Sequence, residues 1–412
     1  MKDLLEISCG LDVHKEKIVA CILSGPLGKP THSEIREFST LIPDMIALRD
    51  WIVSQNCHHV AMESTGIYWM PIYEILEDSF SGDITLLVVN ARHMKNVPGK
   101  KTDMRDSEWI STLLRAGLLN GSFIPEKRIR EFRDLNRYRK SLIRDITSQK
   151  NRIEKFLQSS GFRLSSFISD IFGTSGRNII LHLIEHGQID RTALDSCLKT
   201  KTRSRIDEIL MAVNGTLSEH QKAFLRILMN HYDSLKEHLN QIEKDLEQDM
   251  EPFILQVEQL NSIYGISTTA SCAIIAEIRV DMKPFKTAEH ICSWAGLCPG
   301  NNESAGKRKS TSVTKGNPYI KSMLCEIAWV IAGKRNSYLS AWYWRIKQKK
   351  GAKKAIVALA RKLLVIIYTM LKQGTLFNEA CFEVRRKNCE QKQISRYIRE
   401  LEKHGYHVEA QG

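Results

Sequence analysis

Four acidic residues in the first third of the chain lie in predicted strands or at a predicted helix start, where they could have a chemical role. Asp12 lies inside an apolar run that predicts a β-strand, and carboxylates are disfavoured within strands. Glu63 ends a second run of this kind. Asp103 and Asp106 lie at the expected start of a helix, on one helical face near the positive end of the helix dipole. Taken alone, this last pair is more readily explained as helix capping.

The four carboxylates gain a chemical meaning if the fold brings them together. In an RNase H-like sheet the first strand lies beside the fourth, which would make Asp12 and Glu63 neighbours. The helix that carries Asp103 and Asp106 could then close the cluster. Crowded carboxylates repel one another unless cations neutralise them, and the hard cations Mg²⁺ and Mn²⁺ prefer oxygen ligands. Two such ions about 3.5–4 Å apart would stabilise the attacking and leaving oxygens of a phosphodiester.

The elements that must position these residues predict a mixed α/β sheet. Three short strands joined by tight turns come first, and helices then alternate with strands. The strands are expected at 7–13, 18–24, 33–39, 59–63 and 84–90, and the helices near 43–54, 68–76 and 103–118.

The middle of the chain predicts long helices. Apolar residues recur at helical spacing among many charges over 129–156 and 224–246, with Tyr138 and Phe224 among the positions expected on the apolar stripes. These stripes predict an antiparallel pair or a coiled coil, formed within one chain or between two chains. The intervening residues 161–218 are expected to be helical with loops.

The region after residue 256 combines turns with basic helices. A turn at Gly265 leads into an apolar helix and resembles a helix-hairpin-helix, whose turn amides often meet a phosphate backbone. A turn-rich loop is expected through Asn317, followed by a helix. No acidic residue occurs over 328–378, where basic residues flank the aromatic run 342–344. Such a surface suits nucleic acid, although core tryptophans beneath a solvated helical face would explain the pattern equally well.

The composition is that of an ordinary globular protein with an excess of positive charge. The formal net charge is +13 and the isoelectric point is about 9.2, which favours a polyanionic partner, although solubility alone could explain it. The ten cysteines form no CxxC pair, so they support neither a zinc site nor a disulfide framework and fit a reducing cytoplasm. No signal peptide is visible, and Arg361 and Lys362 interrupt the apolar stretch 355–371, which predicts a buried helix and no membrane association.

Several motifs resemble those of one protein family, the insertion-sequence-110 family of transposases. Its DEDD blocks are matched by Gly10–Lys15, Met62–Trp69 and Lys101–Asp106. Its second conserved region is matched by Ser293–Gly300, Ser304–Lys307 and Thr314–Asn317. Both sets occur in the family's order, and the resemblance spans most of the chain.

The resemblance implies a specific enzyme. It implies a RuvC-like domain that binds Mg²⁺ through Asp12, Glu63, Asp103 and Asp106, and a second domain whose Ser304 attacks DNA and forms a phosphoserine link. It also implies a structured bridge RNA that pairs with donor and target DNA. Family members form dimers and tetramers with active sites composed from two protomers. The expected setting is the bacterial cytoplasm, at the nucleoid.

The residues around Ser304 agree in part with this role. A serine hydroxyl needs a base or a metal to become a nucleophile, and Ser304 has no histidine nearby in the sequence. The basic side chains expected to bind nucleic acid are Lys307, Arg308, Lys309 and Lys315. Ser310 and Ser312 are rival nucleophiles, and His14 and Lys15 flank the first carboxylate without an assigned role.

We therefore expect four regions. They are a RuvC-like domain over 1–125, a helical coiled-coil region over 126–256, a mainly α transposase domain over 257–380, and a charged helical tail over 381–412. Two alternatives stay open: a RuvC-like nuclease that uses metal-bound water without serine chemistry, and a noncatalytic nucleic-acid-binding protein on the same fold.

Overall fold

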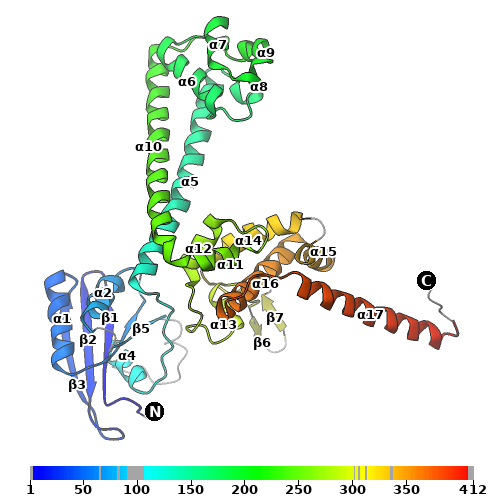
Figure 1. The fold of residues 1–412 in the computed structure, drawn as a ribbon. Coiled ribbons are helices and arrows are strands. Elements are labelled where there is room, and N and C mark those ends of the chain that lie inside the picture. Colours follow the sequence, from blue (N-terminus) through cyan, green and yellow to red (C-terminus); the bar gives the residue numbers. More distant parts are fainter. Residues whose placement is uncertain are drawn as a thin grey trace. The chain divides into compact units, whose positions relative to one another are not determined.

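The computed structural model describes residues 3–64, 66–80, 84–90, 106–300, 302–304, 307–310, 313–334 and 337–406. The chain divides into two compact units, Met1–Ile124 and Pro125–Gly412. The first is a mixed α/β unit, and the second is mainly helical, as expected (Figure 1).

The first unit is built on a five-stranded sheet in the order β3-β2-β1-β4-β5. The first three strands form an antiparallel meander, whereas β1, β4 and β5 run parallel. The expectation that the first strand lies beside the fourth is therefore confirmed. The strands are β1 (Ile7–Val13), β2 (Lys17–Ser24), β3 (His32–Ser39), β4 (His59–Glu63) and β5 (Thr85–Val89).

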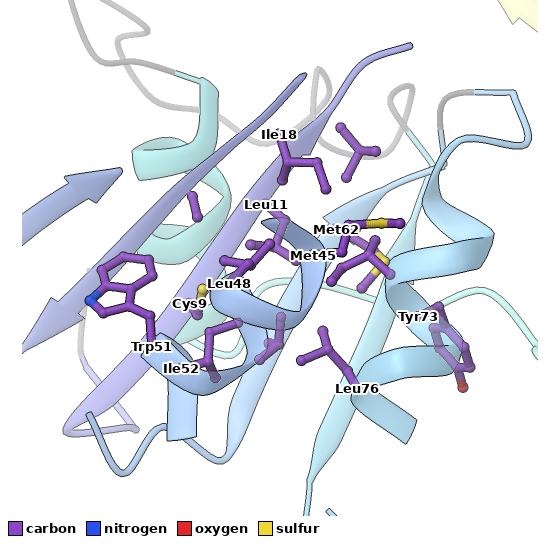
Figure 2. Close-up of a cluster of buried hydrophobic side chains, with 14 of the residues drawn as sticks. Cys9, Leu11, Ile18, Met45, Leu48, Trp51, Ile52, Met62, Tyr73 and Leu76 are labelled. Carbon is purple, nitrogen blue, oxygen red and sulfur yellow. The ribbon is translucent and has the colours of Figure 1, made fainter. Parts of the chain in front are cut away.

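Helices cover both faces of this sheet. On one face, α1 (Ile42–Ser54) and α2 (Trp69–Ser79) bury an apolar cluster that includes Cys9 and Leu11 of β1 (Figure 2). On the other face, α4 (Asp106–Arg115) packs Trp109, Ile110 and Leu113 against Ala61 and Val89. Successive side chains of a strand point to opposite faces, so the residues of β1 divide between these two layers.

The contact between α4 and β1 requires a glycine. A Cβ atom at Gly10 would clash with the carbonyl oxygen of Ser107 and would lie 2.5 Å from the backbone nitrogen of Ser111. Two residues before Gly10 on β1, the Ser8 hydroxyl lies 2.9 Å from the hydroxyl of Ser111. The helix backbone thus lies directly on the strand at Gly10.

The second unit begins with two long helices, α5 (Lys127–Ser159) and α10 (Glu219–Met250), which pair side by side within one chain (Figure 1). Their contacts run in opposite directions, from Arg139–Glu243 through Gln149–Leu228 to Phe156–Phe224. The pair is therefore antiparallel. Two stripe positions are only partly covered by the pairing: Tyr138 is 52% exposed, and Phe224 is 42% exposed although its ring lies 5.2 Å from that of Phe156.

Short helices join the far ends of this pair, which confirms the expected helical character of residues 161–218. They are a 3-10 turn at Leu164–Ser166, α6 (Thr174–His186), α7 (Arg191–Cys197), α8 (Thr200–Arg203) and α9 (Ile206–Ala212).

The remaining helices pack around α16 (Ala352–Gln373), which buries Leu359, Leu363 and Ile367. The helices α13, α14 and α15 each contact it. The other elements are the 3-10 turn Glu251–Phe253, α11 (Ile254–Asn261), α12 (Thr268–Ile278), α13 (Ala288–Trp294), β6 (Asn302–Ser304), β7 (Lys307–Ser310), α14 (Pro318–Gly333), α15 (Tyr338–Lys350) and α17 (Ala380–Lys403).

Three expectations for this region can be compared with the fold. The turn between α11 and α12 contains Gly265 at φ +88°, as the glycine signal predicted. The stretch expected as a loop before Asn317 instead contains the β6–β7 hairpin. Within the described residues, no helix is both long enough and apolar enough to cross a bilayer.

Replacing Gly10 with alanine tests the contact between α4 and β1. We expect Gly10→Ala to push α4 away from the sheet and to destabilise the first unit by about 1–3 kcal/mol, the usual cost of overpacking. Hydrogen exchange of the α4 amides in the full chain measures the effect. Gly333→Ala is the control, because no atom lies within 4 Å of a Cβ built at Gly333. Unchanged α4 protection in Gly10→Ala would contradict the packing described here.

Candidate active site

Asp12 lies near the carboxyl end of β1, on the face covered by α4. Side chains alternate along the strand, so Asp12 points to the same face as Ser8 and Gly10, both of which contact α4. The Asp12 side chain is only 14% exposed, and its Oδ2 lies 3.1 Å from Nε2 of His14. His14 is 52% exposed. The sequence already placed His14 two residues from Asp12, and the structure adds this direct contact between their side chains.

Glu63 lies at the matching point of the neighbouring strand. The parallel register pairs Leu11 with Met62, so Asp12 and Glu63 are the next residues of β1 and β4 in the same direction. Glu63 alternates with Ala61, which packs against α4, and therefore points to the α4 face as well. The structure thus brings Asp12 and Glu63 to the same end and the same face of the sheet.

The direction of α4 carries Asp106 toward this end. Ser111 contacts Ser8, and Ser107, one turn earlier in the helix, lies against Gly10, farther along β1. The helix therefore runs opposite to β1, and its first residue, Asp106, lies toward the carboxyl end of the strand. The amino end of a helix carries partial positive charge, which favours negative groups nearby.

The structure describes part of the predicted carboxylate set. Asp103 lies outside the described residues. Among the residues that are described, no group of three or more His, Cys, Asp or Glu side chains is close enough to hold a metal ion. The chemistry of the donors still suits a hard divalent cation, because Asp12 and Glu63 offer carboxylate oxygens on adjacent strands.

Ser304 is the last residue of β6, in the hairpin of the second unit. The register places Ser304 opposite Lys307 and Glu303 opposite Arg308. Lys309 belongs to the same β7 strand, which Ser310 ends. Two further residues of this loop complete the predicted set: Ser312 lies outside the described residues, and Lys315 is exposed in the segment before α14.

The base of the hairpin is held by backbone contacts. Pro299 and Val313 form a β-bridge, and the amide of Thr314 donates to the carbonyl of Cys298 at 3.0 Å. A Cβ at Gly316 would clash with the backbone nitrogen of Gly296, so the two glycines let these segments touch. The two ends of the loop that carries Ser304 are therefore fastened together.

The basic aromatic region divides between core and surface. Tyr343 is 1% exposed and belongs to the core, whereas Trp344 is 48% exposed. The Lys347 ammonium lies 4.0 Å from the centre of the Trp344 ring. Trp344 and Lys347 thus leave a surface where nucleic acid could bind, and that function stays a prediction.

Two residues that were not singled out from the sequence support the elements that carry the candidate reactive residues, Gly10 in the first unit and Glu277 in the second. Gly10 was part of a matched motif, but the contact that it permits was not foreseen. Glu277, at the end of α12, is 3% exposed and joins α12 to α5 and α14. The available signals were a glycine inside an apolar strand and a carboxylate at the end of an apolar helix.

Comparisons with known proteins point to one class, the transposases. Residues 9–161 match the DEDD transposase family of IS110, and residues 257–344 match the family described as "Transposase IS116/IS110/IS902 family". The first matched segment contains all four predicted carboxylates, and the second contains the Ser304 hairpin. Together they cover more than half of the sequence, and the chain belongs to the IS110 family of transposases.

Individual relatives are distant. A probable family 20 transposase of Pseudomonas aeruginosa is 21% identical over 183 residues, which are 43% of this chain and 54% of that protein. A putative transposase of Sinorhizobium fredii is 29% identical over 30% of this chain and 33% of that protein. A pilin gene-inverting protein of Moraxella lacunata is 31% identical over 25% of this chain and 33% of that protein. The chain thus spans between a third and about half of these relatives' length.

Metal binding tests the acidic end of the sheet. We expect Asp12→Asn to weaken Mn²⁺ binding at least about tenfold, because one carboxylate ligand is lost. Titration of the full chain followed by electron paramagnetic resonance measures the free ion. Glu37→Gln is the matched control, since Glu37 lies on β3 and pairs with Lys17 at 3.2 Å. Equal Mn²⁺ binding by Asp12→Asn and the unmodified protein would refute a metal site at Asp12.

Proposed function

We propose that this protein is a DNA transposase or recombinase that cuts and rejoins the strands of an insertion sequence. The observation that carries the proposal is the placement of Asp12 and Glu63 on one face and at one end of adjacent parallel strands, with the amino end of α4 directed to the same end. Family membership supports it, as do relatives described as transposases and as a pilin gene-inverting protein.

The first unit is proposed to be an RNase H-like, RuvC-like domain. Its strand order, with an antiparallel meander followed by two parallel strands beside β1, supports this assignment. The antiparallel pair of α5 and α10 supports a coiled-coil region that lies, in the sequence, between the segment with the carboxylates and the segment with Ser304.

Asp12, Glu63, Asp103 and Asp106 would hold Mg²⁺ or Mn²⁺. When bound, such ions supply positive charge that stabilises the attacking and leaving oxygens of a phosphodiester. The carboxylates orient the ions. His14, at 3.1 Å from Asp12, would help to fix the rotamer of that ligand.

Ser304 is the proposed nucleophile. Its hydroxyl loses a proton and its Oγ bonds to phosphorus, while the bond from phosphorus to one DNA oxygen breaks and that oxygen takes a proton. A hydroxyl of another strand then loses its proton and bonds to the phosphorus of the phosphoserine, while the bond from phosphorus to Ser304 Oγ breaks and that oxygen takes a proton. The ester retains the energy of the phosphodiester, which suits rejoining better than hydrolysis. Lys307, Arg308, Lys309 and Lys315 would bind the DNA phosphates during both steps.

The proposed partners are donor DNA, target DNA and a bridge RNA encoded by the same element. The positive net charge of +13 supports a polyanionic partner. We propose that the active protein is a dimer that assembles into a tetramer, in which Ser304 reaches the carboxylates of its own chain or of another copy.

The nucleophile is tested by trapping the covalent product. We expect the unmodified protein with Mg²⁺ and donor DNA to form a protein–DNA ester that survives denaturation, and Ser304→Ala to form none. Gel mobility and mass spectrometry of the linked peptide measure the ester. Ser310→Ala is the matched control on the same hairpin and should retain ester formation. DNA cutting that persists in Ser304→Ala would instead favour a nuclease that uses water.

The RNA partner is tested by purification. We expect protein isolated from cells that carry the flanking element to retain a discrete structured RNA, which sequencing identifies. Protein from cells that lack the flanking sequences is the control. If both preparations carry only the same mixed cellular RNA, the proposed guidance is wrong.

A further inference from the structure

A buried ionic cluster lies beside the base of the Ser304 hairpin. Glu277, at the end of α12, accepts hydrogen bonds from Arg137 of α5 at both carboxylate oxygens, at 2.8 and 2.9 Å. Arg133, one turn earlier in α5, donates to the backbone carbonyls of Ala276 and Glu277 at 3.0 and 2.8 Å. The Glu277 side chain is only 4% exposed, so removing one partner would leave a buried charge uncompensated.

Asn317 connects this cluster to the hairpin. Its Nδ2 donates to Oε2 of Glu277 at 2.6 Å, while its Oδ1 accepts from the first amides of α14. Its backbone amide donates to the carbonyl of Trp294 at 3.0 Å. Asn317 therefore ends the loop that starts after Trp294, and it joins that end to α14 and to Glu277.

Two arginine side chains of α5, Arg133 and Arg137, lie close to the buried carboxylate of Glu277. Arg137 also lies over the ring of Tyr319, with its Cζ 4.2 Å from the ring centre. Burial acts to lower the pKa of Arg137, but its hydrogen bond to Glu277 and the charge of Glu277 outweigh burial and raise that pKa. Burial lowers the pKa of Arg133 to about 10, so both guanidinium groups stay charged at neutral pH.

We propose that Glu277 is a positioning residue that, through Asn317, fixes the base of the hairpin carrying Ser304 to helix α5. The inference rests on the proposed serine chemistry for its functional consequence. Glu277 does not touch the reacting atoms in this account. It acts by holding both ends of the loop in one geometry, because small misplacements of a nucleophile cost large factors in rate.

Asn317→Asp tests this contact without removing the cap of α14. The substitution keeps the oxygen that caps α14 but replaces the Nδ2 donor with a second carboxylate beside Glu277. The new carboxylate cannot donate to Glu277 and repels it. We expect looser hairpin amides and ester formation on the order of 10- to 100-fold slower, with the KM for donor DNA within about twofold of the unmodified value, because the nucleophile is misplaced while DNA binding is kept.

Two measurements on the full chain separate position from chemistry. Hydrogen exchange of the amides of Thr314 and Asn317, corrected for intrinsic rates, reports the hairpin base, and the rate of ester formation with donor DNA and Mg²⁺ reports function. Asn317→Ala loses both the cap and the donor and should be impaired in both measurements. Arg139→Gln, which breaks the α5–α10 ion pair to Glu243, is the control for a general loss of helix contacts and should change the ester rate less than about twofold.

The outcomes are distinct. Loosened hairpin amides together with slower ester formation at an unchanged KM for donor DNA in Asn317→Asp support the proposal. Normal amide protection with a normal ester rate in Asn317→Asp, or a loosened hairpin with an unchanged ester rate, overturns it. Should the unmodified protein form no ester at Ser304, the serine chemistry fails and the positioning role fails with it, whereas amide exchange still shows whether Glu277 holds the hairpin base.

Discussion

The close contact of helix α4 with strand β1 is the constraint on which the candidate site depends. It exists because Gly10 has no side chain, so the backbone of α4 at Ser107 and Ser111 can lie directly on the strand. This contact sets the depth and direction of the helix over the sheet. As a result, the amino end of α4 and the ends of two parallel strands face the same region, and carboxylates from distant parts of the sequence can share it.

The second unit uses the same kind of constraint at the hairpin. Gly296 and Gly316 let two backbone segments touch where the loop closes, and Glu277 holds the loop's last residue, Asn317, against α12 and α5. In both units, a small residue allows a close backbone approach and a buried polar contact fixes its geometry. The two candidate reactive groups, carboxylates and serine, are thus each supported by elements that do not take part in the chemistry.

Much of the first unit could be predicted from the sequence because its core follows simple periodicity. The strand Ile7–Val13 and the strand His59–Glu63 have the predicted bounds, since their apolar runs end at polar turns. The β6–β7 hairpin was missed because its short strands are polar and carry no alternating pattern. The Glu277–Arg137 pair joins residues 140 positions apart, which no local pattern can reveal. Tyr138 is 52% exposed although α10 continues past its level to Met250, because apolar spacing does not fix how directly each stripe position faces the partner helix.

Iron-directed cleavage of the polypeptide tests the central claim, which is that the acidic residues converge to hold divalent cations. Fe²⁺ bound in place of Mg²⁺, with ascorbate and peroxide, releases hydroxyl radicals that cut the backbone close to the ion, and mass spectrometry locates the cuts. The account predicts cuts near residues 12, 63 and 103–106 that excess Mg²⁺ suppresses. Cuts confined to other parts of the chain, or none that Mg²⁺ suppresses, would contradict it.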